Sequence, residues 1–295
     1  MLTKFQFHIA EASYKHRLDK FLFDEITAVS RMYLKYLIRE GNCLVNGYAA
    51  LGGYHLKCGD AVEMEIDINA ETAMLPEAIP LEILFEDSEI IVLNKPPEML
   101  VHPTRGVRTG TLLNGLIYHL NFAAEAEPQT GKFQRVGLVH RLDKRTSGLM
   151  VVAKNPHAHK NLSRHFQRKM VEKKYYAVVE GVIKEESGTI NAPIGRDAVE
   201  KFWHVTPDGR VAETNYRVVK RNSETTLLEL EPVTGRTNQL RLHCAHIGHP
   251  IIGDDKYGGR EFARLCLHAF RLSFWHPNGS ERLEFELELP KDFPV

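Results

Sequence analysis

The sequence has little of what marks secreted and membrane proteins. Its four cysteines include no C-x-x-C pair, a usage typical of reduced thiols and not of a disulfide scaffold. No apolar stretch approaches the ~20 residues that span a bilayer. The N-terminal segment lacks the continuous apolar core of a signal peptide. These absences predict a cytoplasmic protein with no membrane partner.

A net charge is also lacking, because 38 Lys and Arg residues balance 38 Asp and Glu residues. The charges are nevertheless segregated along the chain. Residues 131–180 carry a net charge of +9, whereas residues 61–100 carry −9. Since local sign decides what a surface attracts, the basic segment is a candidate surface for an anionic partner such as nucleic acid.

The patterning predicts two domains, with no internal repeat. Residues 1–70 are expected to form a small α/β domain of two short helices followed by short strands. The acidic, proline-containing segment 71–80 is typical of a linker. Residues 81–295 are rich in strand patterns with a few helical ones, which predicts an α+β domain: a mainly antiparallel mixed sheet with flanking helices. Turn residues at 207–209 and 277–279 predict two hairpins in it.

The second helix of the small domain carries a row of cations. Ser30 is placed as its N-cap and Gly41 as its stop. Arg31, Lys35 and Arg39 recur every four residues, which places them on one helix face where a phosphate backbone could lie. An ordinary solvated face explains the same spacing equally well.

The string HRLDK occurs twice, at residues 16–20 and 140–144. Such a short string is weak support for a site by itself. Asp19 stands in a helical pattern, where it is most simply a helix-start acceptor. Asp143 stands on a connection between two predicted strands, and such loops hold side chains rigidly while leaving them accessible.

The longer stretch GLVHRLDKRTSGLMVVAKN around Asp143 closely resembles the signature of the RluA-type pseudouridine synthases. Three further segments match that family in the same order: NKPPEMLVHP, KKYYAVVEG and GRTNQLRLHCAHIGHPIIGDDKYG. The resemblance covers about residues 80–290. Residues 15–67 resemble the small S-four-type RNA-binding domain that often precedes such enzymes.

The resemblance implies a cofactor-independent enzyme that isomerises uridine to pseudouridine within RNA. Asp143 matches the catalytic aspartate, which acts as a nucleophile or as a base. Arg236 matches an arginine that pairs with this carboxylate, and such a pairing would lower the carboxylate pKa. The structural alternative is that Asp143 is an ordinary loop aspartate whose side chain forms an Asx turn.

Three other positions acquire roles from the resemblance. Tyr175 matches the tyrosine of the K-x-Y-x-A pattern, whose ring can stack on the target base. It is preferred to Tyr176 because strand alternation turns the latter to the other face. Arg141 matches an arginine that fills the space left by a flipped nucleotide, or else contacts a phosphate. Leu240 matches an apolar position that lines the uracil site.

Two departures from the family pattern stand out. Asn238 replaces the usual His, and Pro97-Glu98 replaces Ala-Gly. Asparagine can still form hydrogen bonds, so we expect altered RNA positioning before any loss of chemistry.

The predicted substrate is structured RNA, with large-subunit ribosomal RNA favoured over transfer RNA. One alternative is a catalytically inactive RNA-binding protein, which would need the basic surface but not Asp143. Another is a metal-dependent hydrolase, because metal-ligand residue types cluster near the C-terminus. These are His243, Cys244, His246, His249, Cys266 and His268. The absence of an H-E-x-x-H arrangement weighs against a metal site.

Overall fold

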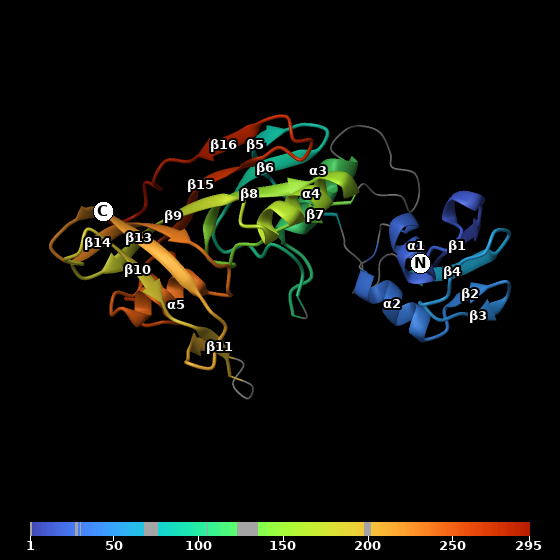
Figure 1. The fold of residues 1–295 in the computed structure, drawn as a ribbon, viewed down its shortest axis with the longest axis horizontal. Coiled ribbons are helices and arrows are strands. Elements are labelled where there is room, and N and C mark those ends of the chain that lie inside the picture. Colours follow the sequence, from blue (N-terminus) through green and yellow to red (C-terminus); the bar gives the residue numbers. More distant parts are fainter. Residues whose placement is uncertain are drawn as a thin grey trace. The chain divides into compact units, whose positions relative to one another are not determined.

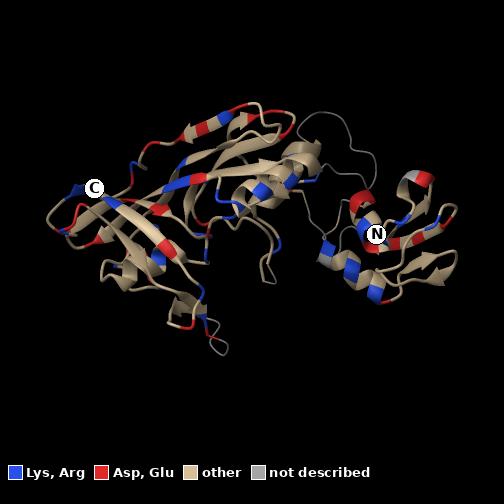
Figure 2. Cartoon of the chain, viewed as in Figure 1, with Lys and Arg blue, Asp and Glu red and all other residues tan. Residues whose placement is uncertain are grey.

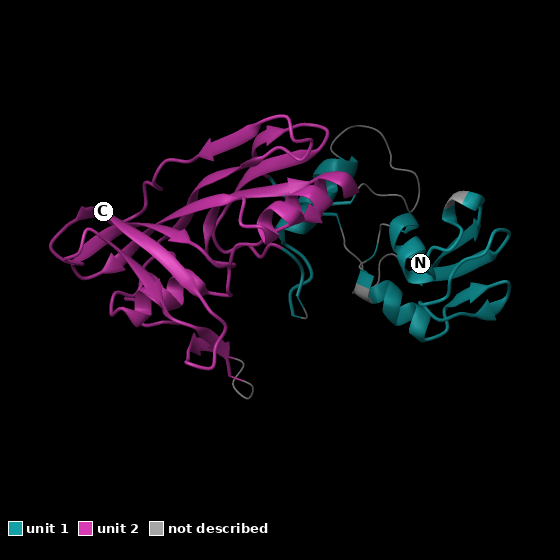
Figure 3. Ribbon diagram, viewed as in Figure 1, with its two compact units in different colours: residues 1–80, 102–136 teal, residues 81–101, 137–295 magenta. Residues whose placement is uncertain are grey.

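The structure is a computed structural model, and it describes residues 2–26, 29, 31–67, 76–104, 106–122, 135–197 and 202–295. The predicted N-cap Ser30 and the first part of the predicted linker lie outside these residues. Two compact units are present (Figure 3), one of residues 1–80 and 102–136, the other of residues 81–101 and 137–295. The predicted domain limits at 70 and 81 stay a prediction.

The first unit contains a four-stranded antiparallel sheet (Figure 1). Its strand order is β1 (Leu2–His8), β4 (Ala61–Asp67), β2 (Cys43–Val45) and β3 (Tyr48–Ala49). Its helices are η1 (Glu11–Ser13), α1 (Leu18–Glu25), α2 (Arg31–Arg39) and α3 (Leu112–Phe122). Strand β1 was not predicted.

Residues 54–60 have a strand-like sequence, YHLKCGD, and are among the short strands predicted for residues 1–70, but they form a loop with a single bridge at His55. The reason lies in Asp60, whose carboxylate accepts hydrogen bonds from the backbone N–H of Lys57, the Tyr54 hydroxyl and the Asn46 amide at 2.8–3.0 Å. These bonds close a turn, which replaces pairing with a neighbouring strand.

Helix α2 is amphipathic, as its sequence predicted. Leu34, Leu37 and Ile38 are buried against the sheet-side core. Arg31, Lys35 and Arg39 are exposed on the helix. Figure 2 shows the blue Lys and Arg positions spaced along α2. The row of cations is therefore available to solvent.

The second unit is built on a ten-stranded mixed sheet (Figure 1). Along the main path its strands are β10 (Ser187–Asn191), β13 (Glu213–Arg221), β14 (Thr225–Pro232), β9 (Glu172–Glu180), β15 (Leu267–Trp275), β8 (Ser147–Ala153), β6 (Ile90–Lys95) and β5 (Glu82–Glu86). Strand β16 (Arg282–Glu286) pairs with β15, and β7 (Gly137–Leu138) pairs with β8. All pairs are antiparallel except β8 with β15. The predicted α+β class, with a mainly antiparallel mixed sheet, is confirmed.

Helix α4 (Pro156–Gln167) packs on the part of this sheet formed by β15, β8 and β6. It begins where the Asn155 side chain accepts a hydrogen bond from the backbone N–H of Ala158 at 2.8 Å, and Pro156 occupies the first turn. Both features favour a helix start. Ala158 and Leu162 then pack against apolar residues of β6, β8 and β15. Helix α5 (Gln239–His246) follows β14. None of the described helices is long and apolar enough to cross a membrane.

The hairpin predicted at 277–279 is confirmed, since β15 pairs with β16 there. The hairpin predicted at 207–209 is wrong, because β12 (Trp203–Val205) pairs with the strand that precedes it in the chain, β11 (Ile194–Arg196), and not with the strand that follows the turn. The turn folds onto β11: a Cβ at Gly209 would meet the Ile194 backbone at 2.5 Å, and Arg210 bridges to Ile194. Only glycine allows this close approach.

Candidate active site

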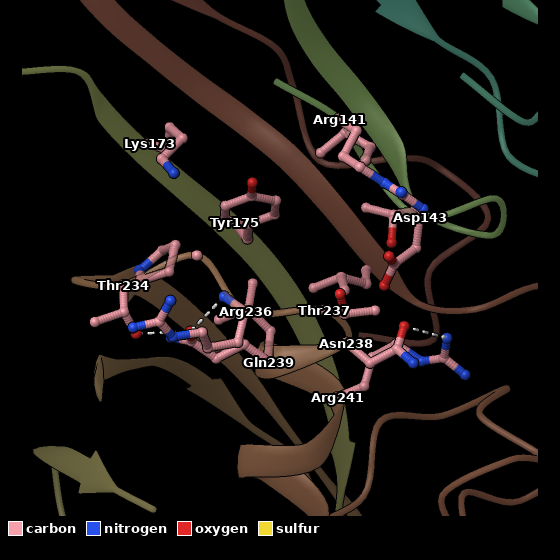
Figure 4. A pocket seen from close by; sticks show the side chains of 16 residues that line it. Arg141, Asp143, Lys173, Tyr175, Thr234, Arg236, Thr237, Asn238, Gln239 and Arg241 are labelled. Atoms are coloured by element: carbon pink, nitrogen blue, oxygen red, sulfur yellow. Dashed lines mark hydrogen bonds between the residues drawn. The ribbon is translucent and has the colours of Figure 1, made fainter. Parts of the chain in front are cut away.

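One pocket in the second unit brings together the five site residues predicted in that part of the chain (Figure 4). Its cavity of about 150 Å³ is bounded by the loop before β8, by β9, by the β14–α5 connection and by β15. The predicted residues on its wall are Arg141, Asp143, Tyr175, Arg236 and Leu240. Arg31, Lys35 and Arg39 belong to the first unit and are not part of this wall.

Asp143 is the single carboxylate on the pocket wall. Burial raises its pKa, while the positive charges of Arg241 and then Arg141 oppose that rise. Within the part of the chain that the structure describes, no hydrogen bond or ion pair reaches this carboxylate. A carboxylate held without a partner is both reactive and costly to keep ionised.

The other HRLDK copy has the opposite surroundings. There Arg17 donates two hydrogen bonds to Asp19, at 3.0 and 3.2 Å. These two bonds are the main reason that the pKa of Asp19 is lowered. The same five letters therefore give a neutralised carboxylate in one place and an unpartnered one in the other.

Lys95 fixes the loop that carries Asp143. Its side chain is fully buried, and its ammonium donates to the carbonyl oxygens of Pro96 (2.6 Å), Met99 (2.9 Å) and Lys144 (3.2 Å). Burial lowers its pKa to about 7, against the opposing influence of Asp143. One cation thus ties the end of β6 to the residue after Asp143.

Gly148 sets the other end of this loop. Its φ is 117°, and a Cβ there would lie 2.3 Å from the carbonyl oxygen of Ala269 on β15. The parallel pairing of β8 with β15 begins here, at Ser147 and Gly148. Glycine is thus required for the close approach that places the Asp143 loop beside β15.

Tyr175 and Tyr176 lie on opposite faces of β9. Tyr175 is 9% exposed and lines the pocket. Burial, together with the charge of Asp143, raises the pKa of its hydroxyl. Tyr176 instead stacks on Phe270 with ring centroids 3.7 Å apart. Strand alternation separates the two rings as the sequence predicted.

The expected pairing of Arg236 with Asp143 is not found in the structure. The Nε atom of Arg236 donates to the carbonyl oxygen of Val211 at 3.0 Å. Its backbone N–H donates to the Gln239 side chain at 2.9 Å. In Figure 4 Arg236 lies with Thr234 and Gln239, away from Asp143.

Arg241 is the cation whose charge most strongly lowers the pKa of Asp143 against the effect of burial. The sequence did not point to this residue. It is buried on α5, where its Nε and one terminal nitrogen donate to the two oxygens of Asp254 at 2.7 and 2.6 Å. Asn238, the departure from the family pattern, accepts a bond from Arg241 at 3.4 Å and donates to the Tyr257 hydroxyl at 2.8 Å. This side of the pocket is a fixed polar network.

A second residue that sequence reasoning missed is Lys173, which lines the pocket from β9. It stands two residues before Tyr175, so the alternation that selected Tyr175 could also have found it. Leu240, 7% exposed, supplies an apolar part of the wall.

The residues of the rival metal hypothesis do not form a ligand set. Over the described ranges, no group of three or more His, Cys, Asp or Glu side chains has a metal-binding arrangement. His243 has Thr214 Oγ1 at 2.9 Å and the Ala192 oxygen at 3.0 Å on its two ring nitrogens. His268 lies 2.7 Å from the Ser147 hydroxyl, and His249 lies 2.7 Å from the Glu180 carbonyl oxygen. These hydrogen bonds explain the cluster as structural polar residues.

The pocket on this mixed sheet holds an unpartnered carboxylate together with arginines and a buried tyrosine. Residues 89–246, which include these groups, match the RNA pseudouridylate synthase family. The chain belongs to that family and is an isomerase of the pseudouridine synthase type.

Its relatives extend over nearly the whole chain. An RNA pseudouridine synthase of Bacillus subtilis, YlyB, is 42% identical over 287 residues, which cover 96% of this chain and 93% of that protein. Ribosomal large subunit pseudouridine synthase D of Pseudomonas aeruginosa is 39% identical over 294 residues, covering 94% and 89%. The solved human RNA pseudouridylate synthase domain containing 1 has a TM-score of 0.60 and 29% identity, covering 72% of this chain and 84% of that one.

Proposed function

We propose that this enzyme converts specific uridines of large-subunit ribosomal RNA into pseudouridine, with Asp143 as its catalytic carboxylate and no cofactor. The observation that carries the proposal is the position of Asp143: among the described residues that line the pocket it is the one acid, it has no partner, and the other charged residues there are cations. Such a site attracts RNA and keeps its one carboxylate available for chemistry.

The reaction is an isomerisation with a simple balance. The bond from N1 of uracil to C1′ of ribose breaks, the base turns, and a bond from C5 to C1′ forms. C5 loses its proton and N1 gains one, so no redox partner or cofactor enters. Asp143 acts on the sugar, either as a nucleophile or as a base.

Other residues on the wall then have defined tasks. Tyr175 stacks on the uracil and lies next to the carbon that loses its proton. Arg241 stabilises the charge of Asp143, which is the part that the sequence suggested for Arg236. Arg236, which the sequence predicted to be a catalytic residue, is reassigned here to substrate binding on the wall. Arg141, exposed beside Asp143, occupies the space of the flipped nucleotide, and Leu240 contacts the uracil.

The choice of RNA is supported by the relatives named for the large ribosomal subunit in Pseudomonas aeruginosa and Pasteurella multocida. We further propose that residues 1–70 are an S-four-type RNA-binding domain, in which Arg31, Lys35 and Arg39 bind phosphates from their exposed helix face. The same proposal places the enzyme in the cytoplasm.

The test is a map of pseudouridines in total RNA from cells with and without the gene. Sites in large-subunit ribosomal RNA that vanish without the gene support the proposal. Sites that vanish only from transfer RNA replace the proposed substrate, and no missing site contradicts the proposed activity.

Two variants identify the catalytic carboxylate. Asp143→Asn keeps the size of the side chain and removes its charge, so turnover is expected to fall at least a thousandfold, roughly the loss seen when a catalytic group is removed, with RNA binding retained. Asp19→Asn is the matched control from the second HRLDK copy and leaves single-turnover chemistry unchanged. Equal loss in both variants would reassign the acid.

A further inference from the structure

Strand β9 carries two adjacent lysines with contrasting surroundings. The ammonium of Lys174 lies 3.1 Å from Glu229 and 3.9 Å from Glu172. The side chain of Lys173 turns to the opposite face and lines the pocket. Over the described part of the chain, the side chain of Lys173 has no hydrogen bond and no carboxylate within 4.0 Å. Its Nζ lies over the ring of Phe166, 5.8 Å from the centroid.

A partly buried ammonium without an anion is unfavourable. Burial lowers the pKa of Lys173, and no nearby charge of the folded chain opposes that effect. Two of the other cations on the pocket wall differ, since Arg241 is paired with Asp254 and Arg236 is bonded to a carbonyl oxygen, while Arg141 is exposed to solvent. The fold therefore leaves Lys173 ready for an anion that arrives with the substrate.

Asp143 is not that anion. Lys173 is not among the charges that shift the pKa of Asp143. Figure 4 shows Lys173 beyond Tyr175 as seen from Asp143. Residues two apart on a strand are about 7 Å apart on the same face. A uridine with its base against Tyr175 and its sugar at Asp143 thus leaves Lys173 on the far side of the base, where the phosphate of an adjacent nucleotide would meet it.

We propose that Lys173 binds a backbone phosphate next to the target uridine and positions the nucleotide for Asp143. This inference rests on the proposed function, because RNA supplies the phosphodiester. Lys173 is a substrate-positioning residue, distinct in its task from Tyr175 on the same face. Its ion pair with the phosphate holds the strand while the base is out of the stack.

The test uses Lys173→Met, which removes the charge and keeps the apolar stem, and Lys173→Arg, which keeps the charge. Lys174→Met is the matched control on the other face of β9. The probe is total RNA labelled with tritium at C5 of uridine, taken from cells that lack the gene. Tritium release is followed in single turnovers over a range of enzyme and salt concentrations.

Lys173→Met is expected to raise the half-saturating enzyme concentration roughly three- to tenfold. The slope of log affinity against log salt concentration should become shallower by about 0.7–0.9, the change expected when one phosphate is no longer neutralised. Lys173→Arg retains most of the affinity and the parental slope. Lys174→Met has the same half-saturating enzyme concentration and the same salt slope as the parent.

Three outcomes would overturn the inference. If Lys173→Met matches an active parent, the ammonium is ordinary solvated surface. If its affinity falls with an unchanged salt slope, Lys173 binds the uncharged base. If Lys173→Arg fails as badly as Lys173→Met, the position has a packing role. A parent that releases no tritium refutes the proposed function itself, and this inference with it.

Discussion

At the scale of single residues, Asp143 trades stability for reactivity. Its pKa is raised in the folded protein, so the folded state holds more protons than the unfolded chain between the ordinary value of about 3.9 and the raised one. In that window the free energy of unfolding falls as pH rises. The ionised carboxylate therefore weakens the fold at neutral pH.

Asp143→Asn should accordingly stabilise the protein at neutral pH. The variant stays uncharged at every pH, so its excess free energy of unfolding is expected to grow from about pH 4 up to the raised pKa of Asp143 and then to level off. Urea denaturation at several pH values measures this difference. A variant that is less stable than the parent at neutral pH would show that Asp143 has a stabilising partner.

Tyr175 offers a second prediction at this scale. Tyr175→Phe keeps the ring and removes the hydroxyl, whereas Tyr175→Ala removes both, so we expect slower chemistry in the first and a deeper defect in the second. Tyr176→Phe remains near normal because its ring stacks on Phe270 outside the pocket. Single-turnover rates at saturating enzyme compare the three, and equal rates would remove Tyr175 from the site.

The arginines show what the sequence leaves undetermined. Arg236 and Arg241 stand in the same matched segment, and spacing cannot say which one turns toward Asp143. Asn238 is the N-cap of α5, and its left-handed backbone (φ 56°, ψ 20°) separates the irregular residues before it from the helix. Arg241 is then inside the helix and Arg236 outside. A positive φ at one non-glycine residue is not readable from a pattern.

At the scale of elements, the sequence patterns predicted most strands of the second unit, including the fully buried β8, but not the pairings of β15 with β8 and β9. Strand β9 and helix α4 follow clear periodicities. Strand β15 is buried along almost its whole length and reads as an apolar run interrupted by Arg271. A run of that kind does not separate strand from helix. The pairing of β15 with β8 and β9, which shapes the pocket, depends on residues far apart in the chain.

Helix α2 provides the prediction for elements. Replacing Arg31, Lys35 and Arg39 with alanine should weaken RNA binding and flatten its salt dependence by about 0.7–0.9 for each phosphate that the helix no longer neutralises. The buried face of α2 is unchanged, so folding is retained. RNA titrations across salt concentrations compare the variant with the parent. An unchanged slope would identify the row as ordinary solvated surface.

At the scale of the whole molecule, the polar residues near the C-terminus predict independence from transition metals. His243 uses both ring nitrogens within the fold, and His249 and His268 each use one. A zinc-selective chelator that leaves magnesium bound to the RNA is therefore expected to change the rate by less than about twofold, since catalytic metal ions contribute far more. Loss of activity that added zinc restores would revive the metal hypothesis.

Lys95 gives the molecule a built-in reporter of local opening. The burial that lowers the pKa of this amine to about 7 also shields it from acylating reagents, so Lys95 reacts as an ordinary lysine only when it becomes exposed. Its complete burial withholds that reactivity as long as its three carbonyl bonds are intact. The rate at which Lys95 is acylated therefore measures how often the segment holding Asp143 detaches from β6, an event that a global unfolding curve does not separate from the rest of the fold.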